Sequence, residues 1–307
     1  MSGLCAGRVC IVTGGARGIG LAHARALAEA GARVIVNDVD EVAVAEAVER
    51  IGAGATACVA DASSGSGASE LIEVALDTAG RLDVVVNNAG ITRDKMLVNL
   101  TEDDWDSVLR VHAKSTFLLT QGAARHWREC SKAGRPVDGR VINTVSSVGL
   151  YGHVGQANYG AAKGAIAAFT IIASMELGRY GVTVNALCPT ALTQMTEVAG
   201  LAETEDGQAG RLDPRWVAPA LVWLASPLSA DVTGRVIVAS GRRLAVAEGW
   251  HRGPTAAPVE DPADVDAVIR RLLAEAAPNA DAQGDLPGPP DDRRLEPGTA
   301  APRRGRP

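Results

Sequence analysis

The stretch TGGARGIG at residues 13–20 carries the strongest structural signal in this chain of 307 residues. It follows a short apolar run that ends at Thr13, and it leads directly into a stretch of helical character, Leu21–Ala30. Glycines at a strand-to-helix turn let backbone N–H groups approach a pyrophosphate, which the positive end of the helix dipole also attracts. The turn is therefore expected to bind a dinucleotide. The residues expected to contact that cofactor are Gly14, Arg17, Gly18, Ile19 and Gly20.

Short apolar runs alternate with longer helical stretches over residues 1–250. The runs expected to be strands are Arg8–Thr13, Arg33–Asp38, Ala57–Asp61, Leu82–Asn87, Arg140–Thr144, Val182–Leu187 and Arg235–Ala239. Their cores are continuously apolar and rich in β-branched residues, which is typical of strands buried on both faces of a parallel sheet. The alternation predicts an α/β fold: a doubly wound Rossmann fold with a seven-stranded parallel sheet. The helices expected between the strands include the long segments Glu102–Thr120 and Tyr159–Arg179.

The composition changes near residue 251, so a single domain with a C-terminal extension is expected. Asp261-Pro262 is a typical helix start, and the apolar residues after it fall on one helical face. Residues 251–277 are therefore expected to form an extension with one short helix. Residues 278–307 are rich in Pro, Gly, Asp, Ala and Arg, which predicts a disordered tail.

Composition also limits the partners and the compartment. Asp and Glu outnumber Lys and Arg by 36 to 30 and aromatic residues make up 3 %, so no nucleic-acid partner is expected. There is neither a run of about 18 uninterrupted apolar residues nor a signal-peptide pattern, so no membrane is expected. The five cysteines are scattered and the five histidines lack ligand spacing, which favours reduced thiols in the cytoplasm and no metal.

The end of the second expected strand bears on the choice of cofactor. Asp38 lies about 20 residues after the glycines, where a carboxylate accepts hydrogen bonds from the adenosine ribose and repels a 2′-phosphate. Asp38 therefore favours NAD. Arg17 is the opposing residue, because a guanidinium in that turn can pair with a 2′-phosphate, so NADP stays open as an alternative.

A second group of polar residues follows the fourth and fifth expected strands. Tyr159 and Lys163 are four residues apart on an expected helix and share one face. Ser146 precedes Tyr159 by 13 residues, and NNAG occupies residues 87–90. Together with the glycine-rich turn, this combination resembles the short-chain dehydrogenase/reductase family over nearly all of residues 7–250.

The resemblance implies the roles of these residues. Tyr159 is implied as the general acid/base, and Lys163 is implied to lower its pKa and to hold the nicotinamide ribose. Ser146 is implied to hydrogen-bond the substrate oxygen. The further cofactor contacts implied are Asp61, Ala62, Asn88, Ala89, Gly90, Pro189 and Thr193. The implied partners are a small-molecule alcohol or ketone and further copies of the chain, in a homodimer or homotetramer built on the two long helices.

Two positions depart from the family pattern. His112 replaces the usual Asn of the fourth helix, so we expect either retained catalysis with an altered proton relay or a buried structural histidine. The stretch SGRR at residues 240–243 replaces the usual Gly-Gly close. Arg242 and Arg243 are either ordinary surface arginines or contacts to an anionic handle of the substrate.

The segments around residues 83–91, 111–112 and 155–159 resemble the hydroxyacyl-CoA dehydrogenase part of the peroxisomal multifunctional β-oxidation enzyme. The implied reaction is NAD(P)-dependent interconversion of a secondary alcohol and a ketone, on a 3-hydroxyacyl thioester or a steroid-like substrate. A biosynthetic polyketide or acyl ketoreductase is the alternative enzyme. A non-catalytic NAD-binding regulatory module is the alternative outside catalysis.

Overall fold

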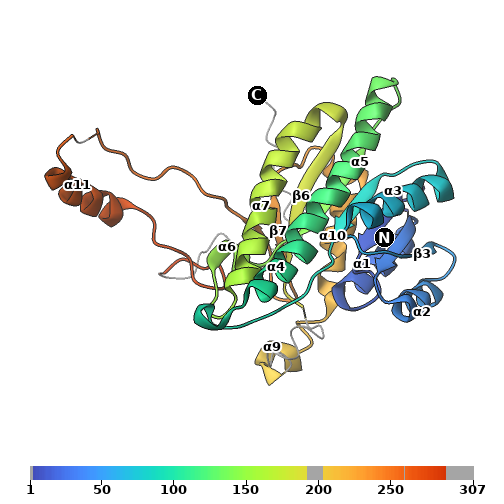
Figure 1. Cartoon of the computed structure of the whole chain (residues 1–307), viewed down its shortest axis with the longest axis horizontal. Helices are drawn as coiled ribbons and strands as arrows, with labels where there is room; N and C mark the ends of the chain where they lie inside the picture. Colours follow the sequence, from blue (N-terminus) through green and yellow to red (C-terminus); the bar gives the residue numbers. More distant parts are fainter. Residues whose placement is uncertain (1–2, 192–202, 259, 288–307) are drawn as a thin grey trace. The chain divides into compact units, whose positions relative to one another are not determined.

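The computed structural model describes residues 3–191, 203–258 and 260–287 (Figure 1). Two compact units divide the chain, one spanning Met1–His251 and the other Arg252–Pro307. The predicted tail lies largely outside the described residues, since the description ends at residue 287.

The first unit is built on one eight-stranded sheet with the order β3-β2-β1-β4-β5-β6-β7-β8. The strands are β1 (Val9–Thr13), β2 (Arg33–Asp38), β3 (Ala55–Val59), β4 (Val84–Asn87), β5 (Gly139–Thr144), β6 (Val182–Pro189), β7 (Val236–Ala239) and β8 (Leu244–Ala247). The first seven are parallel, which confirms the doubly wound Rossmann fold predicted from the sequence.

The predicted strand count was one too low. β8 pairs antiparallel with β7 through a tight reversal at residues 240–243. It has only four residues, and Leu244 is 74 % exposed, so it lacks the buried apolar core by which the other strands were found. An edge strand needs only one partner and no buried face, and its sequence signal is correspondingly weak.

Helices cover both faces of the sheet (Figure 1). Their bounds are α1 (Gly18–Glu29), α2 (Glu41–Ile51), α3 (Gly65–Ala79), α4 (Glu102–Leu109), α5 (Ser115–Lys132), α6 (Ser147–Tyr151), α7 (Ala157–Leu177), α9 (Glu205–Gln208) and α10 (Ala218–Ala225), while α11 (Pro262–Glu275) belongs to the second unit. Val12 packs in a cluster with α1, α2 and α10, whereas its neighbour Ile11 packs in another with α3, α5 and α7. Successive strand residues point to opposite faces, so the continuous apolar runs fill two cores.

The helix expected at Glu102–Thr120 is interrupted. α4 ends at Leu109, a π-helical turn covers Arg110–Lys114, and α5 continues to Lys132. π-Turns insert an extra residue into a helix and often occur at functional sites. This one contains His112.

By length and composition alone, the segment Ala157–Tyr180 is apolar enough to cross a membrane. Within the fold it packs against β5 and β6, and Ala162, Ile166 and Ala173 on its inner face are buried. Core packing therefore accounts for the apolar residues on its inner face.

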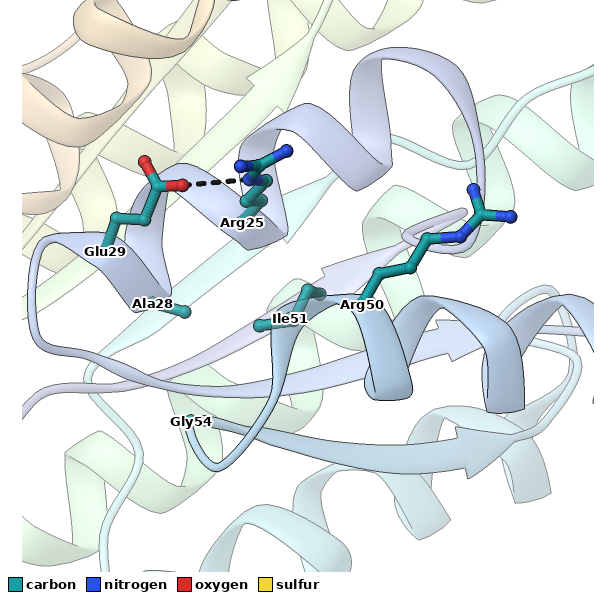
Figure 2. A pocket seen from close by; sticks show the side chains of 6 residues that line it. All are labelled: Arg25, Ala28, Glu29, Arg50, Ile51 and Gly54. Carbon is teal, nitrogen blue, oxygen red and sulfur yellow. Dashed lines mark hydrogen bonds and ion pairs between the residues drawn. The ribbon is translucent and has the colours of Figure 1, made fainter.

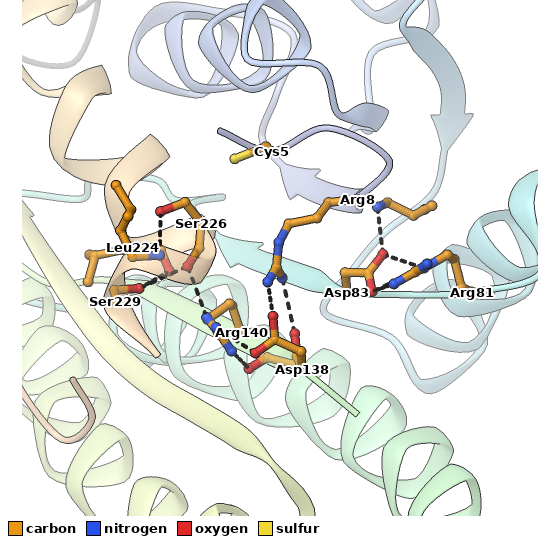
Figure 3. Close-up of polar contacts among 12 residues, drawn as sticks. Cys5, Arg8, Arg81, Asp83, Asp138, Arg140, Leu224, Ser226 and Ser229 are labelled. Atoms are coloured by element: carbon orange, nitrogen blue, oxygen red, sulfur yellow. Dashed lines mark hydrogen bonds and ion pairs between the residues drawn. The ribbon is translucent and has the colours of Figure 1, made fainter. Parts of the chain in front are cut away.

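Charged side chains connect the amino ends of β1, β4 and β5 (Figure 3). Asp83 pairs with Arg81 at 2.6 Å, and the fully buried Arg140 pairs with Asp138 at 2.6 Å. Arg8 pairs with the same Asp138. These contacts stabilise the amino edge of the sheet, and the carboxyl edge is where ligands bind in folds of this kind.

The second unit contains α11. Asp261 caps it by accepting a hydrogen bond from the backbone N–H of Ala263 at 2.9 Å, and Pro262 occupies its first turn. Val265, Ile269 and Leu273 on its apolar face are exposed in the described structure.

Candidate active site

The glycine-rich turn between β1 and α1 does not tolerate side chains at its glycine positions. Gly14 and Gly18 have φ angles of +59° and +52°, in the left-handed region that glycine adopts without strain. A Cβ on Gly20 would collide with the carbonyl oxygen of Gly14, so a side chain there would close the turn. The amino end of α1 has no side-chain cap, so its backbone N–H groups suit the pyrophosphate of a dinucleotide, and the residues present therefore fit NAD(P).

The loop after β4 is fastened to this turn. Asn88 donates its side-chain amide to the carbonyl oxygens of Thr13 at 3.0 Å and Gly14 at 3.2 Å. The Thr13 hydroxyl accepts hydrogen bonds from the backbone N–H groups of Asn88 and Ala89. Thr13 was not among the predicted site residues. Its role arises because β1 and β4 are neighbours, at the point where the strand order reverses.

The adenosine side of the site contains an ion pair that the sequence did not reveal. Asp38, at the end of β2, accepts a hydrogen bond from the backbone N–H of Val39 at 2.8 Å. The Arg17 guanidinium lies 2.5 Å from the carboxylate of Asp40, which also caps α2. The hydrogen bond with Arg17 lowers the pKa of Asp40. Arg17 is thus already paired with a carboxylate on the protein.

Asp61 and Ala62 follow β3 at the same edge. Asp61 accepts hydrogen bonds from the hydroxyl and the backbone N–H of Ser63, which lower its pKa. Arg110 reaches Asp61 at 3.3 Å and the Ser63 hydroxyl at 2.6 Å. Ala62 is buried. Arg110 is a second residue at this edge that was missed, because nothing in the sequence indicates which strand end the π-turn meets.

The structure brings Ser146, Tyr159 and Lys163 together. Ser146 follows β5 and caps α6, and its hydroxyl is hydrogen-bonded to the Tyr159 side chain. Lys163 lies one turn after Tyr159 on α7, with its Nζ 5.6 Å from the centre of the Tyr159 ring. The same Nζ donates to the carbonyl oxygen of Thr144 at 2.7 Å, which fixes the ammonium beneath the phenol.

Burial changes the pKa of both ionisable groups. It raises the pKa of Tyr159 to about 12, and the hydrogen bond with Ser146 opposes this rise. It lowers the pKa of Lys163 to about 7. Charged forms are disfavoured where water is excluded. The phenol therefore keeps its proton without the cofactor, and further positive charge is needed to make it a base near neutral pH.

Cys188, in β6, is a further neighbour of the set that was not predicted. Its thiol accepts a hydrogen bond from the backbone N–H of Ser147, and burial raises its pKa to about 12. The thiol is therefore protonated and unreactive at neutral pH. It is buried in a cluster with Val145, Ile166 and Ala186, close enough to Lys163 for the two groups to interact electrostatically.

His112 is buried and neutral. Its Nε2 lies 2.7 Å from the carbonyl oxygen of Ile91, and its ring meets the Tyr159 ring edge-on with the centres 5.3 Å apart. Burial, followed by the charge of Lys163, lowers the pKa of His112 to about 3. A Cβ on Gly90 would collide with the imidazole, so glycine at 90 and the large ring at 112 fit one another.

Two of the predicted positions remain. Pro189 ends β6 beside Ala239 of β7. Thr193 lies outside the described residues. The described part of the chain holds no group of three His, Cys, Asp or Glu side chains suited to a metal ion.

A separate pocket lies between the last turns of α1 and α2 (Figure 2). Its polar lining is Arg25, which pairs with Glu29 on the same helix at 2.8 Å, and Arg50. Gly54, just before β3, places it at the amino edge of the sheet. It is therefore distinct from the glycine-rich turn and the Ser146, Tyr159 and Lys163 set.

The fold and this set of side chains define a class of protein. Residues 8–205 match the family model described as short chain dehydrogenase, and the chain belongs to that family. It is an oxidoreductase that interconverts an alcohol and a ketone with NAD(P).

Two individual relatives and one solved structure are similar to this chain over most of its length. The chain is 43 % identical to the hydroxyacyl-CoA dehydrogenase ChsB1 of Mycobacterium tuberculosis, over 89 % of this chain and 90 % of that protein. It is 41 % identical to the peroxisomal hydratase-dehydrogenase-epimerase of Neurospora crassa, over 72 % of this chain and 23 % of that longer protein. A crystal structure of a short chain dehydrogenase from Mycobacterium avium superimposes with a TM-score of 0.82 and 44 % identity, covering 91 % of this chain and 99 % of that one.

Proposed function

We propose that this enzyme oxidises the 3-hydroxyl group of an acyl thioester, on an acyl chain or a steroid-like skeleton, with NAD as the hydride acceptor. The observation that carries the proposal is the meeting of Ser146, Tyr159 and Lys163 at the carboxyl edge of the sheet, the edge that also holds the glycine-rich turn. The relative of nearly equal length that is named as a hydroxyacyl-CoA dehydrogenase supports the substrate class.

The side chains perform the proton chemistry. Ser146 and Tyr159 hold the substrate oxygen between their side-chain oxygens, and the deprotonated Tyr159 oxygen takes the proton of the substrate hydroxyl as the carbon–oxygen double bond forms. When bound, the oxidised nicotinamide supplies the hydride acceptor and a positive charge. Lys163 lies beneath the phenol, and the Tyr159 pKa of about 12 is the value with Lys163 in place, so the nicotinamide charge is what lowers it toward the neutral range.

His112 acts as a positioning residue in this scheme. Its neutral ring contacts the edge of Tyr159 and the backbone of Ile91, so it fixes the phenol relative to the loop after β4. The altered proton relay is the competing role. His112→Phe keeps an aromatic ring at this position but has no ring nitrogen. It is therefore expected to retain a kcat at least about tenfold higher than that of His112→Ala, because a misplaced reacting group lowers kcat by this factor or more. Equal losses in both variants would instead favour the relay.

NAD is the proposed cofactor, because the carboxylate of Asp38 ends β2 and Arg17 is already paired with Asp40. A 2′-phosphate would meet the carboxylate of Asp38 and would have to displace Asp40 from Arg17. NADH is therefore expected to bind at least about tenfold more tightly than NADPH, the factor that one lost charge-assisted contact produces. Fluorescence titration of both nucleotides measures this. In Asp38→Asn the ratio should fall, whereas equal affinities in the wild type would show that Arg17 outweighs Asp38.

Turnover tests the substrate class. The purified enzyme is expected to reduce acetoacetyl-CoA with NADH and to oxidise 3-hydroxybutyryl-CoA with NAD, followed at the absorbance of NADH. Turnover with NADPH on acyl-carrier substrates alone would favour the biosynthetic ketoreductase. Nucleotide binding without turnover on thioesters, steroids or simple ketones would favour a regulatory module.

Self-association and a cytoplasmic location complete the proposal. Phe117 on α5, together with Ile171, Ile172 and Met175 on α7, forms an exposed apolar face on the two long helices, which suits a homodimer or homotetramer. Light scattering of the purified chain measures its mass.

All five cysteines are free and buried, which suits a reducing compartment, and fractionation of cells locates the protein.

A further inference from the structure

Two guanidinium groups converge on one carboxylate oxygen beside the substrate side of the site. Arg211 Nη1 lies 3.0 Å from Oδ1 of Asp206, and Arg242 Nε lies 3.0 Å from the same Oδ1. Asp206 belongs to α9, whereas Arg242 lies in the reversal between β7 and β8. The ion pairs thus join two segments that are more than 30 residues apart in the chain.

The backbone holds the two arginines in this arrangement. The N–H of Gly241 donates to the carbonyl oxygen of Arg211 at 3.0 Å, and a Cβ on Gly241 would collide with that oxygen. The Ser240 hydroxyl accepts a hydrogen bond from the N–H of Arg242 at 3.2 Å, which fixes the reversal. Both arginines are therefore held on a defined framework.

The cluster lies at the carboxyl edge of the sheet. β5, β6 and β7 are parallel neighbours, and the reversal that holds Arg242 begins directly after Ala239 at the end of β7. Ser146 follows β5 at the same edge. In sheets of this kind, ligands bind in the crevice outside the carboxyl ends of the strands.

The chemistry of the cluster suits a phosphate better than the carboxylate it holds. Both arginines share one oxygen of Asp206, and Arg211 also reaches Glu205 at 3.4 Å, while a phosphate monoester offers three oxygens and up to two negative charges. The side chains of Asp206, Arg211 and Arg242 are 24 %, 39 % and 55 % exposed, so solvent weakens the existing pairs. An incoming dianion can therefore displace Asp206 at little cost.

We propose that Arg211 and Arg242 form a binding site for a phosphate group on the carrier of the thioester substrate, and that Asp206 occupies this site until the substrate arrives. The proposal rests on the thioester substrate class given above. Coenzyme A carries a 3′-phosphate monoester and a pyrophosphate, whereas the arm of an acyl carrier protein carries one phosphodiester, and each of them offers anionic phosphate oxygens to the two guanidinium groups.

Steady-state kinetics with matched substrates test the site. Acetoacetyl-CoA carries phosphates, whereas the acetoacetyl thioester of N-acetylcysteamine carries none. Arg211→Gln and Arg242→Gln are expected to raise KM for acetoacetyl-CoA about tenfold, the loss typical of one charge-assisted hydrogen bond, and to leave KM for the other thioester unchanged. Asp206→Asn is expected to lower KM for acetoacetyl-CoA, since a neutral amide competes less well for the arginines. Arg215→Gln, a neighbouring arginine outside the cluster, is the control.

A purely structural role of Asp206 predicts the opposite change in KM for the Asp206→Asn variant. If the ion pairs only fasten α9 to the reversal, Asp206→Asn and both arginine variants will raise KM for the two thioesters alike, which overturns the proposal. Acetoacetyl phosphopantetheine identifies the source of the phosphate. An effect equal to that on the CoA thioester assigns the site to the pantetheine phosphate, and an effect confined to CoA assigns it to the nucleotide phosphates.

Calorimetric titration of the enzyme with CoA separates this proposal from the proposed function, because it requires no turnover. Tenfold weaker CoA binding by Arg242→Gln supports the site, and unchanged binding overturns it. A wild-type enzyme that reduces neither thioester overturns the proposed function instead.

Discussion

Tyr159→Phe is expected to lower kcat by about 10³-fold, within the range that a positioned acid/base contributes, while the affinity for NADH changes by less than about twofold. The substitution removes one hydroxyl group. That hydroxyl is hydrogen-bonded to Ser146, and the Lys163 Nζ lies 5.6 Å from the centre of the same ring. Its loss removes the proton acceptor and leaves the glycine-rich turn unchanged. Stopped-flow measurement of the hydride-transfer step and nucleotide titration give the two quantities.

Tyr180→Phe is the matched control for this loss. Tyr180 lies after α7, beside Arg179 and away from Ser146, so the same change of one hydroxyl there should leave kcat within about twofold. Retention of more than a tenth of kcat by Tyr159→Phe would remove the phenol from the catalytic role, whatever the control shows.

Acid is expected to destabilise the protein by about 4 kcal/mol between pH 7.5 and pH 5, from two buried histidines that each contribute about 2 kcal/mol. Burial lowers the pKa of His23 and of His112 from 6.5 to about 3. As the pH falls, the two histidines therefore take up protons at a higher pH in the unfolded chain than in the folded protein. Their stability contribution is fully present above pH 6.5 and is lost as the pH falls toward 3. Lys163 affects stability over a different pH range. Its pKa is lowered to about 7 in the folded protein, so its contribution changes between pH 7 and 10.5.

His23→Leu separates the contribution of one histidine. Both ring nitrogens of His23 are buried without a hydrogen-bond partner in the described structure, so an apolar side chain removes a buried polar group. Urea unfolding at pH 7.5 and pH 5 should show about 2 kcal/mol less acid destabilisation in this variant than in the wild type. His153→Leu, at an exposed position, should behave as the wild type does. An unchanged acid response in His23→Leu would show that His23 is solvated when folded.

Much of the fold was predictable because it is encoded locally. The glycines at residues 13–20 permit one kind of turn, and the apolar runs around it have the length and composition of buried parallel strands. Tyr159 and Lys163 share a helical face by their spacing alone. Local backbone preference and side-chain periodicity depend on neighbours in the chain, which the sequence displays directly.

The remaining features depend on residues that are far apart in the chain. β8 exists because β7 offers it a free edge, and His112 is neutral because the π-turn buries it between Ile91 and Tyr159. By itself the sequence determined the seven parallel strands, the glycine-rich turn between strand and helix, and the shared helical face of Tyr159 and Lys163. Only the tertiary structure decided that Arg17 pairs with Asp40, or that Arg242 and Arg211 meet on Asp206. Charges and ring packing act through distance and solvent exclusion, and these are set when separate strand ends come together at one edge of the sheet.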